Sequence, residues 1–235
     1  MIVTADDFGR SEGINRGVVR AHEDGIVTSA SLMVRWPAAR AAAAYARDRG
    51  TLDLGLHVDL AERVFRGEAW VAVYEVVPLD DESGVEAELE RQLEVFARLV
   101  GRPPSHIDSH QHVHRKEPVR RVLRAAASRL GVALRGETEG IAYRGDFYGQ
   151  ESRGDPVPGA ISPDRLVAIL GSLPEGITEL SCHPGLGDGL PEPYTHERTQ
   201  EVEALCDPRV RAALEEGGVV LRGFPDRANL CVDDE

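Results

Sequence analysis

The chain has 235 residues, and its 27 Lys and Arg against 40 Asp and Glu give a formal net charge of −13 at pH 7. This length can bury a full hydrophobic core, and a hydrophobic content of 42% is ordinary for a globular domain. The negative charge disfavours a nucleic-acid backbone or an anionic membrane as partner. No run of about 20 apolar residues occurs, so the sequence predicts no membrane insertion.

The cysteines and the first residues predict a cytoplasmic protein. Cys182, Cys206 and Cys231 are odd in number and lack CxxC spacing, which is typical of free thiols in a reducing compartment. Residues 1–7 carry two acids where a signal peptide would need a basic and then an apolar stretch. A homodimer is the common default for the oligomeric state.

Short β-branched runs alternate with segments of helical periodicity along most of the chain. The expected strands are Ile2–Ala5, Ile26–Val34, Leu52–Leu56, Ser105–Asp108, Val132–Arg135, Ile177–Ser181 and Val219–Leu221. The expected helices are Ser11–Asp24, Pro37–Arg49, Ser83–Val100, Glu117–Leu130, Ser162–Leu173 and Glu197–Glu216. Ala61–Asp81 is expected to form an irregular insertion and Gly136–Gly159 a long loop.

This alternation predicts an α/β fold with parallel strands and right-handed crossovers. With about seven strands, we expect a distorted or partly closed (β/α) barrel. No glycine-rich phosphate loop follows the first strand, which disfavours an open nucleotide-binding sheet. Because no internal repeat or low-complexity linker occurs, residues 1–235 are expected to form a single domain. In such a barrel the chemistry gathers at the C-terminal ends of the strands.

Acids and histidines occur at four of these strand ends. The four places are Asp6-Asp7, His57, the run from Ser105 to His114, and Cys182–Gly185. Adjacent carboxylates repel each other, so an apolar strand end favours both only when a cation or a proton separates them. Successive residues of an extended chain point to opposite sides, so Asp6 and Asp7 can serve different roles. The structural alternative is a helix cap or turn pair before Ser11.

The run from His106 to His114 is the strongest local signal. His106, Asp108, His110, His112 and His114 share parity, but one continuous strand would span about 26 Å, which is longer than usual. We therefore expect the strand to end near Asp108 and the later histidines to enter a loop. Four histidines with an acid among them suggest metal ligands and their supporting residues. A solvated histidine-rich loop is the alternative.

The two isolated histidines, His57 and His183, are compatible with either a structural or a chemical role. Asp59 lies two residues after His57 and is a candidate for orienting its ring, as metal-bound imidazoles require. His183 lies in a turn fixed by Pro184-Gly185, where a histidine that titrates near neutral pH can act as a proton donor.

At these residues the chain resembles the YdjC-like carbohydrate deacetylases, whose best understood members act on chitin-derived oligosaccharides. Five segments carry the resemblance in the family's order: TADDFG (Thr4–Gly9), GIVTSASLMV (Gly25–Val34), GLH (Gly55–His57), PSHIDSHQHVH (Pro104–His114) and ITELSCHPG (Ile177–Gly185). Ala61–Asp81 and Gly136–Gly159 depart from the family's pattern, and both are expected to shape the sugar cleft.

The resemblance implies a metal-dependent N-deacetylase of an acetylated amino sugar, either chitooligosaccharide-like or linked to a glycolipid. One divalent metal would be held by Asp7, His57 and His110. Asp6 would be the general base, His183 the general acid, and Arg135 a substrate contact. One carboxylate and two imidazoles leave open positions for water and a substrate oxygen. This ligand set favours Zn²⁺, although metal availability also admits Mg²⁺, Mn²⁺ or Co²⁺.

Two other functions remain open from the sequence. The HxH pair His110 and His112 suggests another barrel hydrolase, an amidohydrolase or a phosphoesterase, many of which use two metals. A non-catalytic barrel that binds sugar or metal is the second. Asp6 distinguishes a catalytic barrel from a non-catalytic one, because a protein that only binds sugar or metal does not need a free carboxylate next to the proposed metal ligand Asp7.

Overall fold

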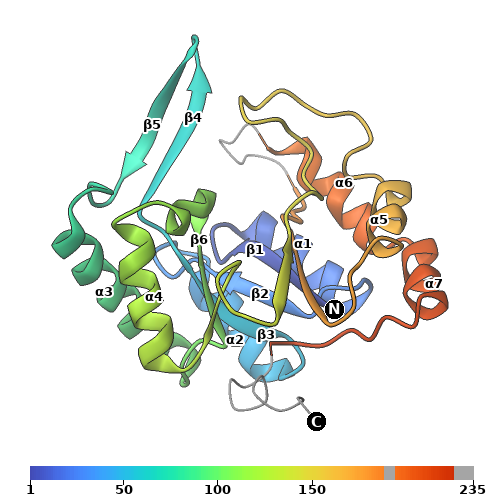
Figure 1. Ribbon diagram of the computed structural model, residues 1–235, viewed down its shortest axis with the longest axis horizontal. Helices are drawn as coiled ribbons and strands as arrows, with labels where there is room; N and C mark the ends of the chain where they lie inside the picture. Colours follow the sequence, from blue (N-terminus) through green and yellow to red (C-terminus); the bar gives the residue numbers. More distant parts are fainter. Residues whose placement is uncertain (188–193, 225–235) are drawn as a thin grey trace.

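A sheet of parallel strands forms the centre of the fold. The computed structural model describes residues 1–187 and 194–224. In that part of the chain the sheet comprises β1 (Ile2–Phe8), β2 (Ser29–Leu32), β3 (Asp53–Val58), β6 (His106–Ser109), β7 (Ala133–Leu134), β8 (Ile141–Arg144) and β9 (Ile177–Cys182). The strand order is β7-β6-β3-β2-β1-β9-β8, and every neighbouring pair is parallel. The sheet curls, and its edge strands do not pair with each other, so the barrel is only partly closed (Figure 1).

Helices surround this sheet and pack on one another. They are α1 (Glu12–Glu23), α2 (Ala39–Arg49), α3 (Glu82–Val100), α4 (Val119–Leu130), α5 (Pro163–Leu170), α6 (His196–Leu205) and α7 (Pro208–Glu216). The pairs in contact are α4 with α3, α3 with α2, α1 with α6, and α5 with both α6 and α7. The sequence-based expectation of a parallel α/β half-barrel is confirmed.

Helix α1 shows how the local sequence specifies these elements. The Ser11 side chain accepts a hydrogen bond from the Ile14 N–H at 3.1 Å and caps the first turn. Ile14, Val18 and Ala21 recur at helical spacing and are fully buried against the sheet. Because this pattern is local, the expected helix Ser11–Asp24 and the observed helix differ by only one residue at each end.

The expectation of an irregular insertion at Ala61–Asp81 was wrong. The segment forms a two-stranded antiparallel hairpin, β4 (Ala61–Arg66) and β5 (Ala69–Glu75), which projects from the body of the molecule (Figure 1). Gly67 and Glu68 connect the strands with φ angles of 56° and 67°, the left-handed pair that a tight two-residue hairpin turn requires. Because much of β5 faces solvent, its residues lack the alternation of a half-buried strand.

Three further expectations are corrected near the C-terminal half. The expected loop Gly136–Gly159 contains strand β8, which pairs with β9. The expected helix Glu197–Glu216 is two helices, because Asp207 caps α7 and Pro208 begins it. Val219–Leu221 forms no strand, although Met1 contacts this segment through its N-terminal amine and the Val220 carbonyl at 2.6 Å.

The cysteine expectation can be checked at two positions. Cys182 is buried and Cys206 is half-buried, and both are free thiols. Cys231 lies outside the described residues. Nowhere in residues 1–187 and 194–224 does a helix reach the length and hydrophobicity needed to cross a membrane.

Helix α1 approaches the turn after β9 so closely that a glycine is required. A Cβ on Gly17 would lie 2.3 Å from the Gly185 Cα, which no real contact allows. The Leu186 N–H donates to the Gly13 carbonyl at 2.9 Å and holds this contact. The helix therefore supports the turn that carries His183.

We expect Gly17→Ala to destabilise the protein by about 2 kcal/mol, because overpacking costs more than the roughly 1 kcal/mol that alanine gains in a helix. Urea unfolding measures the difference. Arg20→Ala, an exposed substitution on the same helix, should change stability by less than about 0.5 kcal/mol. A Gly17→Ala protein as stable as the wild type would contradict the close contact.

Candidate active site

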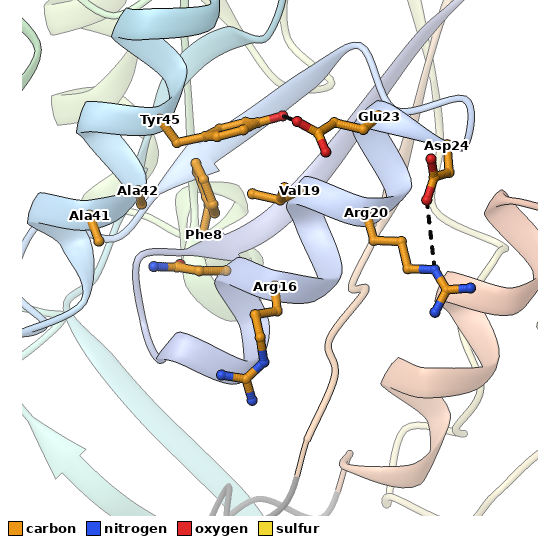
Figure 2. Close-up of a pocket in the computed structure, with 10 residues that line it drawn as sticks. Phe8, Arg16, Val19, Arg20, Glu23, Asp24, Ala41, Ala42 and Tyr45 are labelled. Carbon is orange, nitrogen blue, oxygen red and sulfur yellow. Dashed lines mark hydrogen bonds and ion pairs between the residues drawn. The ribbon is translucent and has the colours of Figure 1, made fainter.

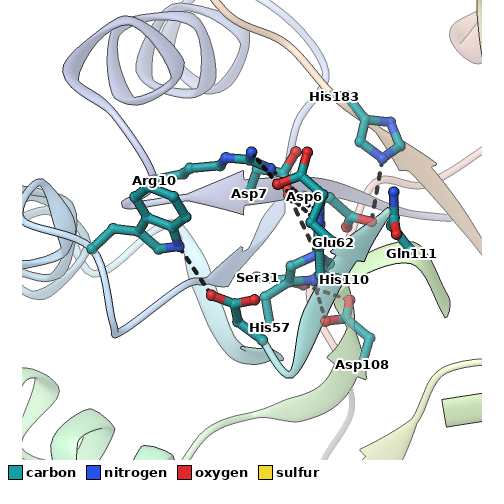
Figure 3. Close-up of polar contacts among 12 residues, drawn as sticks. Asp6, Asp7, Arg10, Ser31, His57, Glu62, Asp108, His110, Gln111 and His183 are labelled. Carbon is teal, nitrogen blue, oxygen red and sulfur yellow. Dashed lines mark hydrogen bonds and ion pairs between the residues drawn. The ribbon is translucent and has the colours of Figure 1, made fainter. Parts of the chain in front are cut away.

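Acids and histidines from four strand ends converge in one cleft. Asp6 and Asp7 come from β1, His57 from β3, His110 from the 3₁₀ turn η1 (His110–Arg115) after β6, and His183 from the turn after β9. All of them line a cavity of about 810 Å³, and Figure 3 shows the polar contacts that join them. This volume is within the range of small-molecule binding sites.

A second hollow of about 330 Å³ lies between α1 and α2 and has a different character (Figure 2). Phe8, Val19, Ala42 and Tyr45 contribute apolar surface, and charged side chains of α1 surround them. The Tyr45 hydroxyl donates to the Glu23 carboxylate at 3.3 Å. None of the residues singled out in the sequence lines this hollow, so the larger cleft is the candidate site.

An irregularity in β1 brings both adjacent carboxylates into the cleft. The register with β2 shifts between Ala5 and Phe8, and Asp7 has a φ of 63°. A regular strand would send Asp6 and Asp7 to opposite sides of the sheet. Left-handed backbone at a residue other than glycine is costly, and such strain clusters at functional sites.

Three side chains have the arrangement of metal ligands. The Asp7 Oδ1 atom lies 3.1 Å from His110 Nδ1 and 3.4 Å from His57 Nε2. One potential ligand atom of each residue lies within 4.8 Å of the others, and all three residues are buried. Two ligands of one cation with bonds of about 2.1 Å lie about 3.4 Å apart in a tetrahedral site. The residues therefore fit a single divalent cation.

The orientation of His57 is fixed by Asp108. His57 Nδ1 lies 2.7 Å from Asp108 Oδ1, which places the N–H on Nδ1 and leaves Nε2 to face Asp7. Burial lowers the pKa of His57, but the charges of Asp108 and Asp6 outweigh it and raise the pKa to about 10. The site thus favours positive charge strongly. Asp59, the partner suggested by sequence, instead accepts hydrogen bonds from Arg35, Trp36 and Tyr74.

Asp6 is held by a buried guanidinium. Both Asp6 oxygens accept hydrogen bonds from Arg135, each at 2.7 Å. Burial raises the pKa of Asp6, but the charge and hydrogen bonds of Arg135 outweigh it, so the pKa lies below its usual value. Asp6 is therefore ionised at neutral pH and has a fixed orientation.

Arg135, the expected substrate contact, is buried beneath Asp6 and does not line the cleft. Its side chain is fully buried and also pairs with Asp108 at 2.6 Å and Glu179 at 2.7 Å. Asp6, His57 and Asp108 form another group with metal-ligand spacing. Arg135 already neutralises the two carboxylates of that group, which disfavours a second cation there.

His183 lies across from Asp6, with Nε2 3.7 Å from Asp6 Oδ2. The rings of Tyr148 and Tyr194 flank it at 5.2 and 5.9 Å between centroids. Burial lowers the pKa of His183 to about 4, although Asp6 and Asp7 act in the opposite direction. The imidazole is therefore neutral at pH 7, and its exposed edge faces both the cleft and Asp6.

Sequence reasoning missed Arg198, which lies on α6. Its guanidinium donates to Asp7 Oδ2 at 2.5 Å and to the His183 carbonyl at 3.2 Å. Burial raises the pKa of Asp7, but Arg198 and His110 outweigh it and hold the pKa well below its usual value. Nothing in the local sequence marks this arginine, because its partner is 191 positions away.

The other histidines of the His106–His114 run have different positions. His106 is fully buried and stacks on Phe224 at 3.9 Å, and His114 lies 2.7 Å from the Ser109 hydroxyl. His112 lines the cleft, 3.3 Å from the Tyr143 hydroxyl. The strand does end after Asp108, and of the four histidines His110 alone joins Asp7 and His57.

Comparisons with known proteins identify the family of the chain. The family model described as YdjC-like protein matches residues 1–216. The chain is 33% identical to a chitooligosaccharide deacetylase of Serratia marcescens, across 96% of this chain and 98% of that protein. It is 34% identical to a carbohydrate deacetylase of Geobacillus stearothermophilus, across 94% of each.

Solved structures share the fold. A protein of Enterococcus faecalis described as a cellobiose-phosphate cleavage protein superposes with a TM-score of 0.75 at 26% identity, covering 95% of this chain and 96% of that one. A family 4 carbohydrate esterase of Streptomyces lividans, in complex with acetate, gives a TM-score of 0.59 at 14% identity, covering 97% and 93%. The match over most of the chain and the two curated relatives show that this protein belongs to the YdjC-like family.

Proposed function

We propose that the protein is a metal-dependent carbohydrate N-deacetylase that hydrolyses the acetamide of an acetylated amino sugar. The observation that carries the proposal is the convergence of three residues with metal-ligand spacing, a fixed carboxylate and a histidine in one cleft. The names of the curated relatives support a carbohydrate substrate that carries an acetyl group.

Asp7, His57 and His110 would hold the divalent cation. When bound, the cation would supply Lewis-acid chemistry, polarising the acetamide carbonyl and acidifying the attacking water. The mixed oxygen and nitrogen ligands suit Zn²⁺. Mg²⁺, Mn²⁺ or Co²⁺ would occupy the same site where the cell supplies more of that ion. His57 is held in the required tautomer by Asp108.

Asp6 is proposed to be the general base. Arg135 keeps it ionised and fixes both of its oxygens, so it can take a proton from water without reorienting. The ion pair with Arg135 also makes Asp6 a weaker base. A weak base is enough here, because the bound cation would itself lower the pKa of the water.

His183 is proposed to protonate the departing amine. Breaking the C–N bond requires a proton on nitrogen, because an amide anion is a poor leaving group. A neutral His183 must first acquire this proton, and Asp6 holds one after it has deprotonated the water. The 3.7 Å separation between Asp6 Oδ2 and His183 Nε2 is short enough for that transfer after a small movement.

The cation site is tested by substitution of each ligand. Asp7→Ala, His57→Ala and His110→Ala should each weaken divalent-metal binding by more than about 100-fold and abolish acetate release, because one ligand of three is lost. Isothermal titration calorimetry should give one metal per wild-type chain. His196→Ala, an exposed histidine on α6, serves as the control. Unchanged metal content in the three variants, or two metals per wild-type chain, would contradict the assignment.

Asp6→Asn separates catalysis from binding. Asparagine keeps the shape of the side chain but cannot accept the proton, so kcat should fall by about 10²–10⁴. The metal affinity should stay within about threefold of the wild type, because Asp6 is not a ligand. Acetate release and calorimetry on the same preparation measure the two effects. Full turnover in this variant would mean that Asp6 is not the base.

His183→Ala tests protonation of the leaving group. We expect kcat/KM on N-acetylated sugars to fall by about 10²–10⁴, whereas hydrolysis of p-nitrophenyl acetate should fall by less than about tenfold. The ester's phenolate leaves without a proton, so it does not need the histidine. Equal losses on both substrates would assign His183 to binding or structure instead.

A further inference from the structure

The β4–β5 hairpin carries an aromatic pair that the proposed reaction does not use. Phe65 and Trp70 are directly opposite each other in the two strands, with ring centroids 5.7 Å apart. Both line the same cavity as Asp6, Asp7 and His57. The cleft therefore runs without interruption from the cation site to these two rings.

Stability of the fold does not explain Trp70. The residue is 52% exposed, so folding buries only about half of its large apolar surface. Exposed aromatic side chains at the edge of a polar cleft are typical of binding sites. Val73, on the same strand, is 53% exposed but does not line the cleft, and it provides a natural comparison.

The hairpin is fixed to the body at its base. The Tyr74 hydroxyl donates to Asp59 at 2.7 Å, and the Gln111 side chain pairs with the Arg63 backbone through bonds of 2.9 and 2.8 Å. Arg10 donates to Glu62 at 2.7 Å, with both side chains buried. These contacts hold the aromatic pair in a set position relative to the cation site.

A loop on the other side of the cleft meets this pair. The Arg153 guanidinium lies over the Phe65 ring, 5.2 Å from its centroid. Gln150 and Glu151, from the same loop, also line the cavity. An aromatic face beside hydrogen-bonding side chains matches a pyranose ring, which has an apolar C–H face and a rim of hydroxyl groups.

The pair lies closer to the hairpin tip than the part of β4 that is near the proposed ligands. Glu62 Oε2 lies 4.0 Å from Nε2 of the proposed ligand His110. Phe65 is three residues further along β4 towards the turn at Gly67 and Glu68, which is about 10 Å of strand. This position suits a sugar ring other than the one that is deacetylated. We propose that Phe65, Trp70 and Arg153 form an outer subsite for a further sugar ring of the substrate, so that the enzyme selects by chain length. This inference rests on the proposed deacetylase function.

The test compares substrates of increasing length. Acetate release would be measured on N-acetylglucosamine and on its β-1,4-linked di-, tri- and tetrasaccharides, with wild type, Trp70→Ala and Val73→Ala. The ratio of kcat/KM on the tetrasaccharide to that on the monosaccharide should fall about tenfold in Trp70→Ala, because one aromatic stacking contact contributes about that factor. Val73→Ala should keep the wild-type ratio. Phe65→Ala should lower the ratio in the same direction.

Binding of the tetrasaccharide, followed by calorimetry, separates this inference from the proposed function. If wild type releases no acetate from any sugar, the deacetylase function is wrong, and a Trp70-dependent affinity still supports the subsite. If acetate is released but Trp70→Ala keeps both the wild-type ratio and affinity, the subsite is wrong. A change of oligomeric state in Trp70→Ala with an unchanged ratio would make the pair a protein interface and would also overturn the inference.

Discussion

The site depends on one buried guanidinium. Arg135 follows β7 and pairs with Asp6 of β1, Asp108 of β6 and Glu179 of β9, with no exposure of its side chain. Buried charges are tolerated only when they are paired and hydrogen-bonded, so these strand ends cannot shift independently. Asp108 in turn orients His57. Burial raises the pKa of Glu179 to about 7, so this carboxyl group is partly protonated at neutral pH. Partial protonation lowers the net negative charge of the three carboxyl groups that surround Arg135. The proposed base and one proposed ligand thus share a single anchor.

Helix α6, which is near the C-terminal end of the chain, contacts the proposed ligand Asp7 and the turn that carries His183. Arg198 pairs with Asp7, while Glu201 accepts hydrogen bonds from the His183 N–H and the Tyr194 hydroxyl. Burial raises the pKa of Glu201 to about 8, so this carboxyl is largely protonated at neutral pH and adds little negative charge. One helix therefore positions a proposed ligand and the proposed acid together, and any movement of α6 would affect both.

In the proposed function, the groups that carry out the chemistry and those that select the substrate lie on different parts of the fold. Groups that would move protons or hold a cation lie on strand ends, which are fixed by the sheet and by Arg135. The aromatic pair and Arg153 lie on a hairpin and a loop that extend beyond the sheet (Figure 1). Such excursions can change in length and composition without disturbing the core, whereas a strand end cannot. The two segments that the sequence analysis expected to shape the sugar cleft, Ala61–Asp81 and Gly136–Gly159, contain this hairpin and this loop.

The sequence by itself determined the parallel α/β architecture, most of its helices, and the meeting of acids and histidines from four strand ends. These features follow from local periodicity and from the rule that parallel strands place their C-terminal ends on one side. The choice of Asp7, His57 and His110 among those residues came from the resemblance to the YdjC-like family, and the structure brings the three together. Only the tertiary structure decided that Asp7 leaves the strand at φ 63°, that Arg135 is buried under Asp6 rather than exposed to substrate, and that Arg198 contacts Asp7. Pairings between residues more than 100 positions apart, such as Asp6 with Arg135, leave no periodic trace in the sequence. Such pairs form in the folded protein because a charge that is buried without an opposite charge beside it is strongly destabilising.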